Sequence, residues 1–277
     1  MLQGSGEETD TNLNPKSKIP MSLLRIWAIA ANGFREVIRD RILYVIAFFS
    51  LILALAMRFL PDISAGNSDK IFLDLGLASI ALLGAIMSIF VGTSLINKEI
   101  EKRTVLVLIP KPISIMELIV GKHLGLTAVL TVAIAVMTAV LLLMLAISQI
   151  SYSLSYLLLC QLFLVLELAL LTAIAITFGS FTSSFLATLL SFGVYLIGHI
   201  SADLLKFAEI SKNESITAIS RGIYLIIPDL ERFNLKNQIV YNLLPSSTDL
   251  LSSAVYGIAY IVFLLGIATL IFSRREF

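Results

Sequence analysis

Six long apolar segments constrain the fold of this 277-residue chain more than any other feature of its sequence. Each approaches or exceeds the roughly 20 residues that an α-helix needs to cross the hydrocarbon core of a bilayer. Every backbone amide in hydrocarbon must be paired within the protein, and a helix achieves this inside one segment. The sequence therefore predicts an all-α membrane protein with six transmembrane helices at Ile42–Leu60, Ile71–Ile96, Leu124–Ile147, Leu154–Gly179, Phe181–Ile200 and Leu251–Phe272.

The composition excludes several classes of protein. Hydrophobic residues make up 58% of the chain and charged residues 14%, against about 25% charged residues in soluble domains. The mean hydropathy is +0.95, so a water-soluble enzyme is excluded. The net charge of +1 gives no reason to expect a nucleic-acid partner.

Motifs of catalysis and metal binding are also missing from the sequence. One cysteine, Cys160, cannot form an intrachain disulfide, and two histidines are too few for a His-rich metal site. No HExxH, GxSxG or GxxxxGK[ST] pattern occurs. We therefore expect no catalytic residue, cofactor or metal in this chain, and any ATPase activity would belong to a partner.

Short connections indicate a single membrane domain over residues 21–277. The polar residues 1–20 are predicted to be a disordered tail. A longer loop at 201–249 is predicted to lie outside the cytoplasm and to contain short helices, at Ala202–Ile210 and Ile216–Ile227. Asp229, which follows Pro228, is a candidate cap for a further turn or helix.

The positive charges predict the orientation. An even number of spans places both termini on one side, and about two thirds of the 20 lysine and arginine residues fall on that side or in the 97–123 loop. Lysine and arginine are enriched in cytoplasmic loops. Both termini and the 97–123 loop are therefore expected in the cytoplasm.

Residues 22–41 are predicted to form an amphipathic helix in the cytoplasmic membrane interface. Its apolar stripe consists of Leu23, Trp27, Ala30, Phe34 and Val37. Such a helix places its tryptophan at the depth of the lipid headgroups and its arginines in water or on anionic lipid. Two hypotheses remain open: a membrane-surface anchor, or a helix that also contacts a partner subunit.

The 97–123 loop is the most charged stretch beside the membrane. Pro110 and Pro112 end the preceding helix, and Ser114 and Glu117 have the spacing of a capping box that starts the next one. The loop thus forms an exposed elbow whose tip is apolar, at Val105, Leu106, Val107, Leu108 and Ile109. Apolar surface of this kind predicts a protein partner.

Polar residues within the spans are few. Glu167 lies in the middle of the fourth span, where an ionisable group is costly and is a functional candidate on the substrate path or as a proton site. It has no obvious basic partner in another span, so it would be protonated, face a polar cavity, or bond to a hydroxyl such as that of Thr172. His199 lies near the end of a span and is expected to be interfacial. In the second span Gly84, Ser88 and Gly92 permit close helix packing or dimerisation.

Three motifs at the elbow resemble permease subunits of type-2 ATP-binding-cassette exporters, in particular the subgroup similar to the NosY permeases. They are Glu99-Ile100-Glu101-Lys102-Arg103-Thr104, Pro112-Ile113-Ser114-Ile115-Met116-Glu117 and Gly121-Lys122-His123-Leu124-Gly125. Upstream, Phe34-Arg35-Glu36 and Arg39-Asp40-Arg41 resemble the entry helix of that family. At Ile115 the family commonly has arginine, so a charge contact from this position is not expected.

The resemblance implies two permease copies, identical or paralogous, on two cytoplasmic ATPase subunits that bind ATP and Mg, in a bacterial cytoplasmic (inner) membrane. The elbow (residues 97–123) would be the coupling helix. The coupling residues implied by position are Glu101, Arg103, Thr104, Leu108, Pro110, Pro112 and Glu117, and the interface-helix residues are Trp27, Arg35 and Arg39.

Two other functions fit the sequence. One is a secondary transporter that is coupled to protons through Glu167, although one mid-span carboxylate and no visible inverted repeat argue against it. The other is a membrane scaffold that recruits cytoplasmic proteins without transport. The substrate cannot be read from the spans, whose apolar walls favour an amphiphilic or hydrophobic molecule, and export is implied by the resemblance alone.

Overall fold

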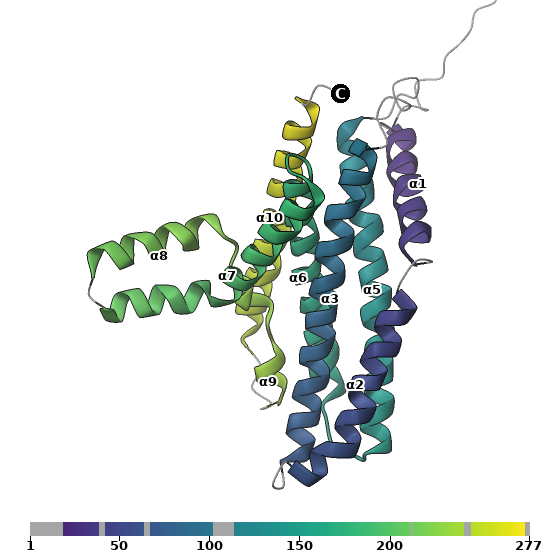
Figure 1. Cartoon of the computed structure of the whole chain (residues 1–277), viewed down its shortest axis with the longest axis vertical. Coiled ribbons are helices and arrows are strands. Elements are labelled where there is room, and N and C mark those ends of the chain that lie inside the picture. The colour runs from purple at the N-terminus through teal and green to yellow at the C-terminus, as the bar shows by residue number, and fades with distance from the viewer. Residues whose placement is uncertain are drawn as a thin grey trace, which may run out of the picture.

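The chain folds into a helical bundle from whose side one helical hairpin projects (Figure 1). The computed structural model describes residues 19–38, 42–63, 67–101, 114–211, 213–240 and 245–274. The helices of these residues are α1 (Ile19–Ile38), α2 (Ile42–Ile63), α3 (Ser68–Glu101), α5 (Ile115–Ile147), α6 (Leu154–Gly179), α7 (Ser184–Ser211), α8 (Glu214–Ile226), the 3₁₀ helix η2 (Glu231–Phe233), α9 (Lys236–Val240) and α10 (Ser247–Ser273).

Six of the described helices are long and apolar enough to cross a membrane, which confirms the predicted number of spans. They are α2, α3, α5, α6, α7 and α10. Some boundaries differ from the predicted ones. The third span begins at Ile115 because the capping box starts its helix within a polar stretch. The fifth continues to Ser211, so 202–210, predicted as a separate short helix, is the end of α7.

The bundle is built around α3 and α6, the two most buried spans. Helix α6 packs against α3, α5, α7 and α10, whereas α2 lies on the outside against α3 and α5. The small residues Gly84 and Gly92 of α3 lie against Leu168 and Ala175 of α6. Between them the Ser88 hydroxyl lies 2.9 Å from the Thr172 hydroxyl and donates to the Leu168 carbonyl at 3.1 Å. The predicted small-residue stripe therefore packs within the chain.

Helix α1 lies along α5 (Figure 1). The close approach requires Gly125, because a Cβ atom there would lie 2.6 Å from the carbonyl oxygen of Ala30. The face of α1 toward α5 thus differs from the predicted apolar stripe: Ala30 is buried, but Leu23 and Trp27 are exposed. The helix also begins at Ile19, within the segment predicted as a disordered tail; residues 1–18 lie outside the described residues.

The C-terminal part of α7 and all of α8 form a projecting hairpin, which comprises residues 202–211 and 214–226 (Figure 1). Where the hairpin leaves the bundle, the Gly198 carbonyl accepts hydrogen bonds from the Leu230 amide at 3.1 Å and from the Ser201 hydroxyl at 3.1 Å. A Cβ atom at Gly198 would lie 2.8 Å from the Leu230 side chain. Residues 198–201, which we call the α7 hinge, therefore hold the chain that returns from α8.

We expect Gly125→Ala to destabilise the chain, because the added methyl group would meet the backbone of α1. Overpacking of this kind costs about 1–3 kcal/mol. Gly266→Ala is the matched control, since no described atom lies within 4 Å of its added Cβ. The thermal midpoint in detergent, followed by the fluorescence of the single tryptophan, should fall for Gly125→Ala alone. Equal midpoints for the two variants would contradict the close packing of α1 on α5.

Candidate functional site

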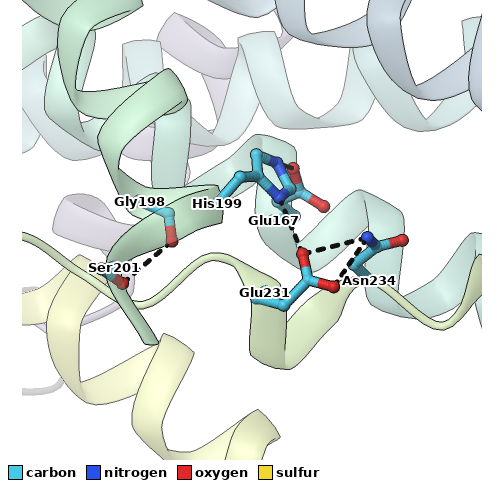
Figure 2. A network of polar contacts seen from close by, with 6 residues as sticks. All are labelled: Glu167, Gly198, His199, Ser201, Glu231 and Asn234. Carbon is cyan, nitrogen blue, oxygen red and sulfur yellow. Dashed lines mark hydrogen bonds and ion pairs between the residues drawn. The ribbon is translucent and has the colours of Figure 1, made fainter. Parts of the chain in front are cut away.

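Three ionisable side chains from three elements meet at one place in the bundle. Glu167 comes from the middle of α6, His199 from α7 and Glu231 from η2 (Figure 2). His199 Nε2 lies 3.0 Å from Glu167 Oε1, and His199 Nδ1 lies 3.3 Å from Glu231 Oε2. Both ring nitrogens of His199 are thus hydrogen-bonded to carboxylates, and we call these residues the Glu167–His199–Glu231 triad.

The triad runs from the interior of the bundle to its surface. The side chains of Glu167, His199 and Glu231 are 5%, 20% and 42% exposed, respectively. Asn234 donates hydrogen bonds to both oxygens of Glu231, at 3.1 and 3.0 Å. Burial alone would raise the pKa of Glu231, but the hydrogen bonds from His199 and Asn234, with the charges of His199 and Lys236, lower this pKa below its ordinary value.

The triad corrects the sequence analysis at two residues. Glu167, for which no basic partner in another span was apparent, lies against His199 of α7. Thr172, given as an example of a hydroxyl that could bond to Glu167, instead pairs with Ser88. The sequence feature that could have predicted this pair is a histidine within an apolar span, because such a histidine needs a polar partner as much as a glutamate does. Glu231 could not be assigned, because only the fold brings it to His199.

A small cavity lies beside Glu167, between α6 and the segment that leads into α9. Its volume is about 10 Å³, roughly the space that one water molecule needs. Its polar lining includes Gln161, Glu167, Asn234 and Lys236. Gln161 Oε1 and Asn234 Oδ1 have no hydrogen-bond partner among the described residues. The cavity thus gives the buried carboxylate a polar neighbourhood, one of the three environments expected for it.

A second polar group fixes the chain between α8 and η2. Arg232 Nε donates to Asp229 Oδ2 at 3.1 Å, and an Arg232 terminal nitrogen donates to the Tyr224 hydroxyl at 3.1 Å. The hydrogen bond that Arg232 donates to Tyr224 is the largest of the interactions that raise the pKa of Arg232. The guanidinium also lies 5.0 Å from the ring centroid of Tyr256. Asp229 therefore forms an ion pair with Arg232, and the prediction that it caps a helix is wrong.

The structure describes the two ends of the elbow. Helix α3 ends at Glu101, and α5 begins after Ser114, whose hydroxyl accepts from the Glu117 amide at 3.1 Å. The Ser114 amide in turn donates to the Glu117 carboxylate at 2.9 Å, which confirms the predicted capping box. Trp27 and Arg35 lie exposed on α1. Predicted residues that lie outside the described residues are Arg39, Arg103, Thr104, Leu108, Pro110 and Pro112.

The chemistry open to the triad is proton binding and release. Imidazole and carboxyl groups exchange protons near neutral and acidic pH. Within the part of the chain that the structure describes, no group of His, Cys, Asp and Glu side chains is arranged to hold a metal ion. The triad is therefore a hydrogen-bonded network that joins α6, α7 and η2.

The sequence matches the model of a family described as ABC-2 family transporter protein over residues 27–277. This range includes most of α1, all six spans and the triad. A search of curated proteins finds none that matches the chain.

Removing one member of the Glu167–His199 pair should lower the free energy of unfolding more than replacing both members by apolar residues. We expect His199→Leu to destabilise the chain by about 3 kcal/mol, since it leaves Glu167 buried without its donor. In the double variant with Glu167→Leu most of this loss should be recovered, because a buried pair and an apolar pair differ little. Asp62→Asn, in the exposed Arg58–Asp62 pair, should change stability by no more than about 1 kcal/mol. Unfolding in mixed micelles would be measured for the wild type, His199→Leu, Glu167→Leu, their double variant and Asp62→Asn. Losses in the double variant that equal the sum of the two single losses would contradict the pairing.

Lowering the pH should weaken the contribution of Glu231 to the stability of the folded chain. Because the folded-state pKa of Glu231 lies below its ordinary value of 4.5, its stabilisation is present above pH 4.5 and is lost as the pH falls through the folded-state pKa. Thermal midpoints between pH 7 and pH 3 should therefore fall less steeply in Glu231→Gln than in the wild type. Glu214→Gln removes an exposed acid of α8 and should retain the wild-type slope. Equal slopes for all three proteins would exclude the His199–Glu231 interaction.

Proposed function

The chain belongs to the ABC-2 family of transporter proteins, and from this premise we propose that it is the permease of an exporter driven by a separate cytoplasmic ATPase. The observation that carries the proposal is the extent of the family match, from residue 27 to residue 277 and across all six apolar helices. Such a family places the chain in a membrane as a permease subunit of an ATP-binding-cassette transporter. ATP and Mg would bind to the partner subunit.

The geometry of α3 and α5 supports coupling through the elbow. At a rise of 1.5 Å per residue, the 34 residues of α3 extend about 50 Å, well beyond a hydrocarbon core of about 30 Å. The apolar part of α3 ends at Leu95, so its last residues continue out of the membrane. Helix α5 packs against α3 and starts at a capping box in which both hydrogen bonds are formed. A force on the segment between them would therefore reach two spans at once.

The proposed coupling residues lie at or within this segment. Glu101 and Arg103 would contact the ATPase, with Thr104 and Leu108 in the same surface. Pro110 and Pro112 would fix the shape of the segment, and Glu117 would hold the start of α5 through the capping box. The exposed Trp27 and Arg35 would anchor α1 in the headgroup region, together with Arg39.

The exposed apolar side chains on the outer helices support contact with lipid and with a second permease copy. They occur along α2 and α10, including Leu51, Leu55, Phe59, Val255, Val262 and Phe263. Lysine and arginine counts support cytoplasmic termini in a bacterial inner membrane. The same apolar surroundings favour an amphiphilic or hydrophobic substrate.

The coupling assignment predicts that Glu101→Gln and Arg103→Gln lower the ATP hydrolysis of the assembled complex. A hydrogen bond to a charged group contributes about 1.5–3 kcal/mol, so we expect a fall of roughly tenfold or more. The complex would be purified through a tag on this chain and reconstituted in nanodiscs, and phosphate release would be measured. Both variants should still co-purify with the ATPase.

Asp69→Asn is the matched control, because Asp69 is an exposed acid at the opposite end of α3. It should hydrolyse ATP at the wild-type rate. Wild-type rates for Glu101→Gln and Arg103→Gln would show that the elbow does not couple the subunits. Transport driven by a proton gradient in the absence of any ATPase would favour the secondary transporter, and a chain that binds cytoplasmic proteins without transport would be a scaffold.

A further inference from the structure

The hydrogen bonds of the triad require a fixed number of protons. An ionised carboxylate only accepts hydrogen bonds, and a neutral imidazole has one N–H group and one acceptor nitrogen. Both ring nitrogens of His199 lie within hydrogen-bond distance of a carboxylate oxygen. Two hydrogens are therefore needed, either as an imidazolium between two carboxylates or as a neutral imidazole with one protonated glutamate. In both forms the triad holds one proton more than a neutral histidine between two ionised glutamates.

The charges around the triad favour the bound proton. The groups that face it are Cys160 on α6, Tyr195 on α7 and Lys236 on α9, while Asp229 and Arg232 neutralise each other nearby. The protonated triad carries one negative charge, which Lys236 balances. Loss of the proton would leave two negative charges and turn a nitrogen lone pair toward a carboxylate, an arrangement that is costly near the interior of a bundle.

The triad lies at the α7 hinge. At this place α7 is hydrogen-bonded to the bundle through Gly198 and His199, and Figure 2 shows the bonds of His199. Further along α7, the Ala208 carbonyl accepts from the Thr217 hydroxyl of α8. The ring of Tyr195 packs edge-on against His199, with centroids 4.8 Å apart. The connection after α8 returns to the same place, because Glu231 and Leu230 follow it in the chain. The two segments that join the projecting hairpin to the bundle, α7 before the hinge and the connection from α8 to η2, are thus both bonded to the bundle at the triad.

We propose that Glu167, His199 and Glu231 form a proton-binding site that fixes the projecting hairpin to the bundle, and that release of the proton frees the hairpin. Glu231 is the most exposed of the three carboxyl and imidazole groups and gives the proton its route to the surface. Proton release breaks one N–H···O hydrogen bond, so His199 loses its bond either to Glu167 of α6 or to Glu231 of η2, and the Gly198–Leu230 bond is left to hold the hinge. The ligand of the site is a proton, and its effect is on the angle at the α7 hinge. This site needs no ATPase, so it can be tested on the permease chain alone.

Spin labels on the hairpin and the bundle would measure the hinge. Ala218 of α8 and Ser155 of α6 are exposed, whereas the single cysteine, Cys160, is buried and protected from labelling. Ala218→Cys/Ser155→Cys protein in nanodiscs should give one narrow label-to-label distance at neutral pH. That narrow distance should be lost as the pH rises and the proton leaves. Since the chain has only two histidines, ¹⁵N NMR of labelled imidazole would show the pH at which the nitrogens of His199 respond to loss of the proton from the triad, whether it leaves the imidazole or a glutamate.

His199→Gln tests the site directly, because both N–H groups of a glutamine amide lie on one nitrogen, which cannot take the places of the two ring nitrogens of His199, and the amide does not titrate. This variant should lack the narrow distance at every pH. Tyr195→Phe is the matched control: it changes an ionisable ring against His199 but leaves the triad intact, and it should respond to pH as the wild type does. A narrow distance in His199→Gln at neutral pH would overturn the proposal, whatever the wild type does. A wild-type label-to-label distance that stays narrow after the triad has lost its proton would also overturn the proposal.

Discussion

A polar group inside an apolar bundle must find its partner within the protein, because hydrocarbon offers no hydrogen bonds. In this chain α6 is where those partners meet. Each of the four spans packed on α6 shares a side-chain hydrogen bond with it. From the neighbours, Ser88 of α3 bonds to the Leu168 carbonyl, His123 of α5 to the Ala169 carbonyl at 2.9 Å, and His199 of α7 to the Glu167 carboxylate. From α6 itself, the Thr177 hydroxyl donates to the Leu264 carbonyl of α10 at 3.2 Å. These bonds fix the rotation of every neighbour about the central helix. Packing of leucines alone would leave that rotation poorly specified, since apolar surfaces of similar size are interchangeable.

The same arrangement relates the two regions for which functions are proposed, the elbow and the Glu167–His199–Glu231 triad. The elbow is flanked by α3 and α5, and the α7 hinge is held by α6 through Glu167. Helix α3 packs along α6 through small residues and the Ser88–Thr172 contact, so a displacement of α3 at the elbow acts on the helix that carries the triad. Physical continuity of this kind is what allows two distant sites in a protein to be coupled.

The features that the sequence predicted well are local ones. A run of apolar residues needs only its own length to be recognised as a span, and the capping box of Ser114 and Glu117 depends on residues three positions apart. The triad depends on residues 32 positions apart on each side of His199, and sequence periodicity carries no information about such pairs. The close contact at Gly198 could not be predicted for a related reason: the glycine is explained by Leu230, which the fold brings against it. On α1 the amphipathic pattern indicated a helix correctly, but it did not show that glycines of α5 would lie against Ile29 and Ala30.

The place of the α7 hinge also decides which residues complete the fifth span. Residues 184–198 make about 22 Å of helix, less than the roughly 30 Å of hydrocarbon that a typical membrane presents. The apolar span of α7 runs on to Ala208, so its full length includes residues of the projecting hairpin. Length along the membrane normal and orientation of the hairpin are therefore properties of one and the same helix.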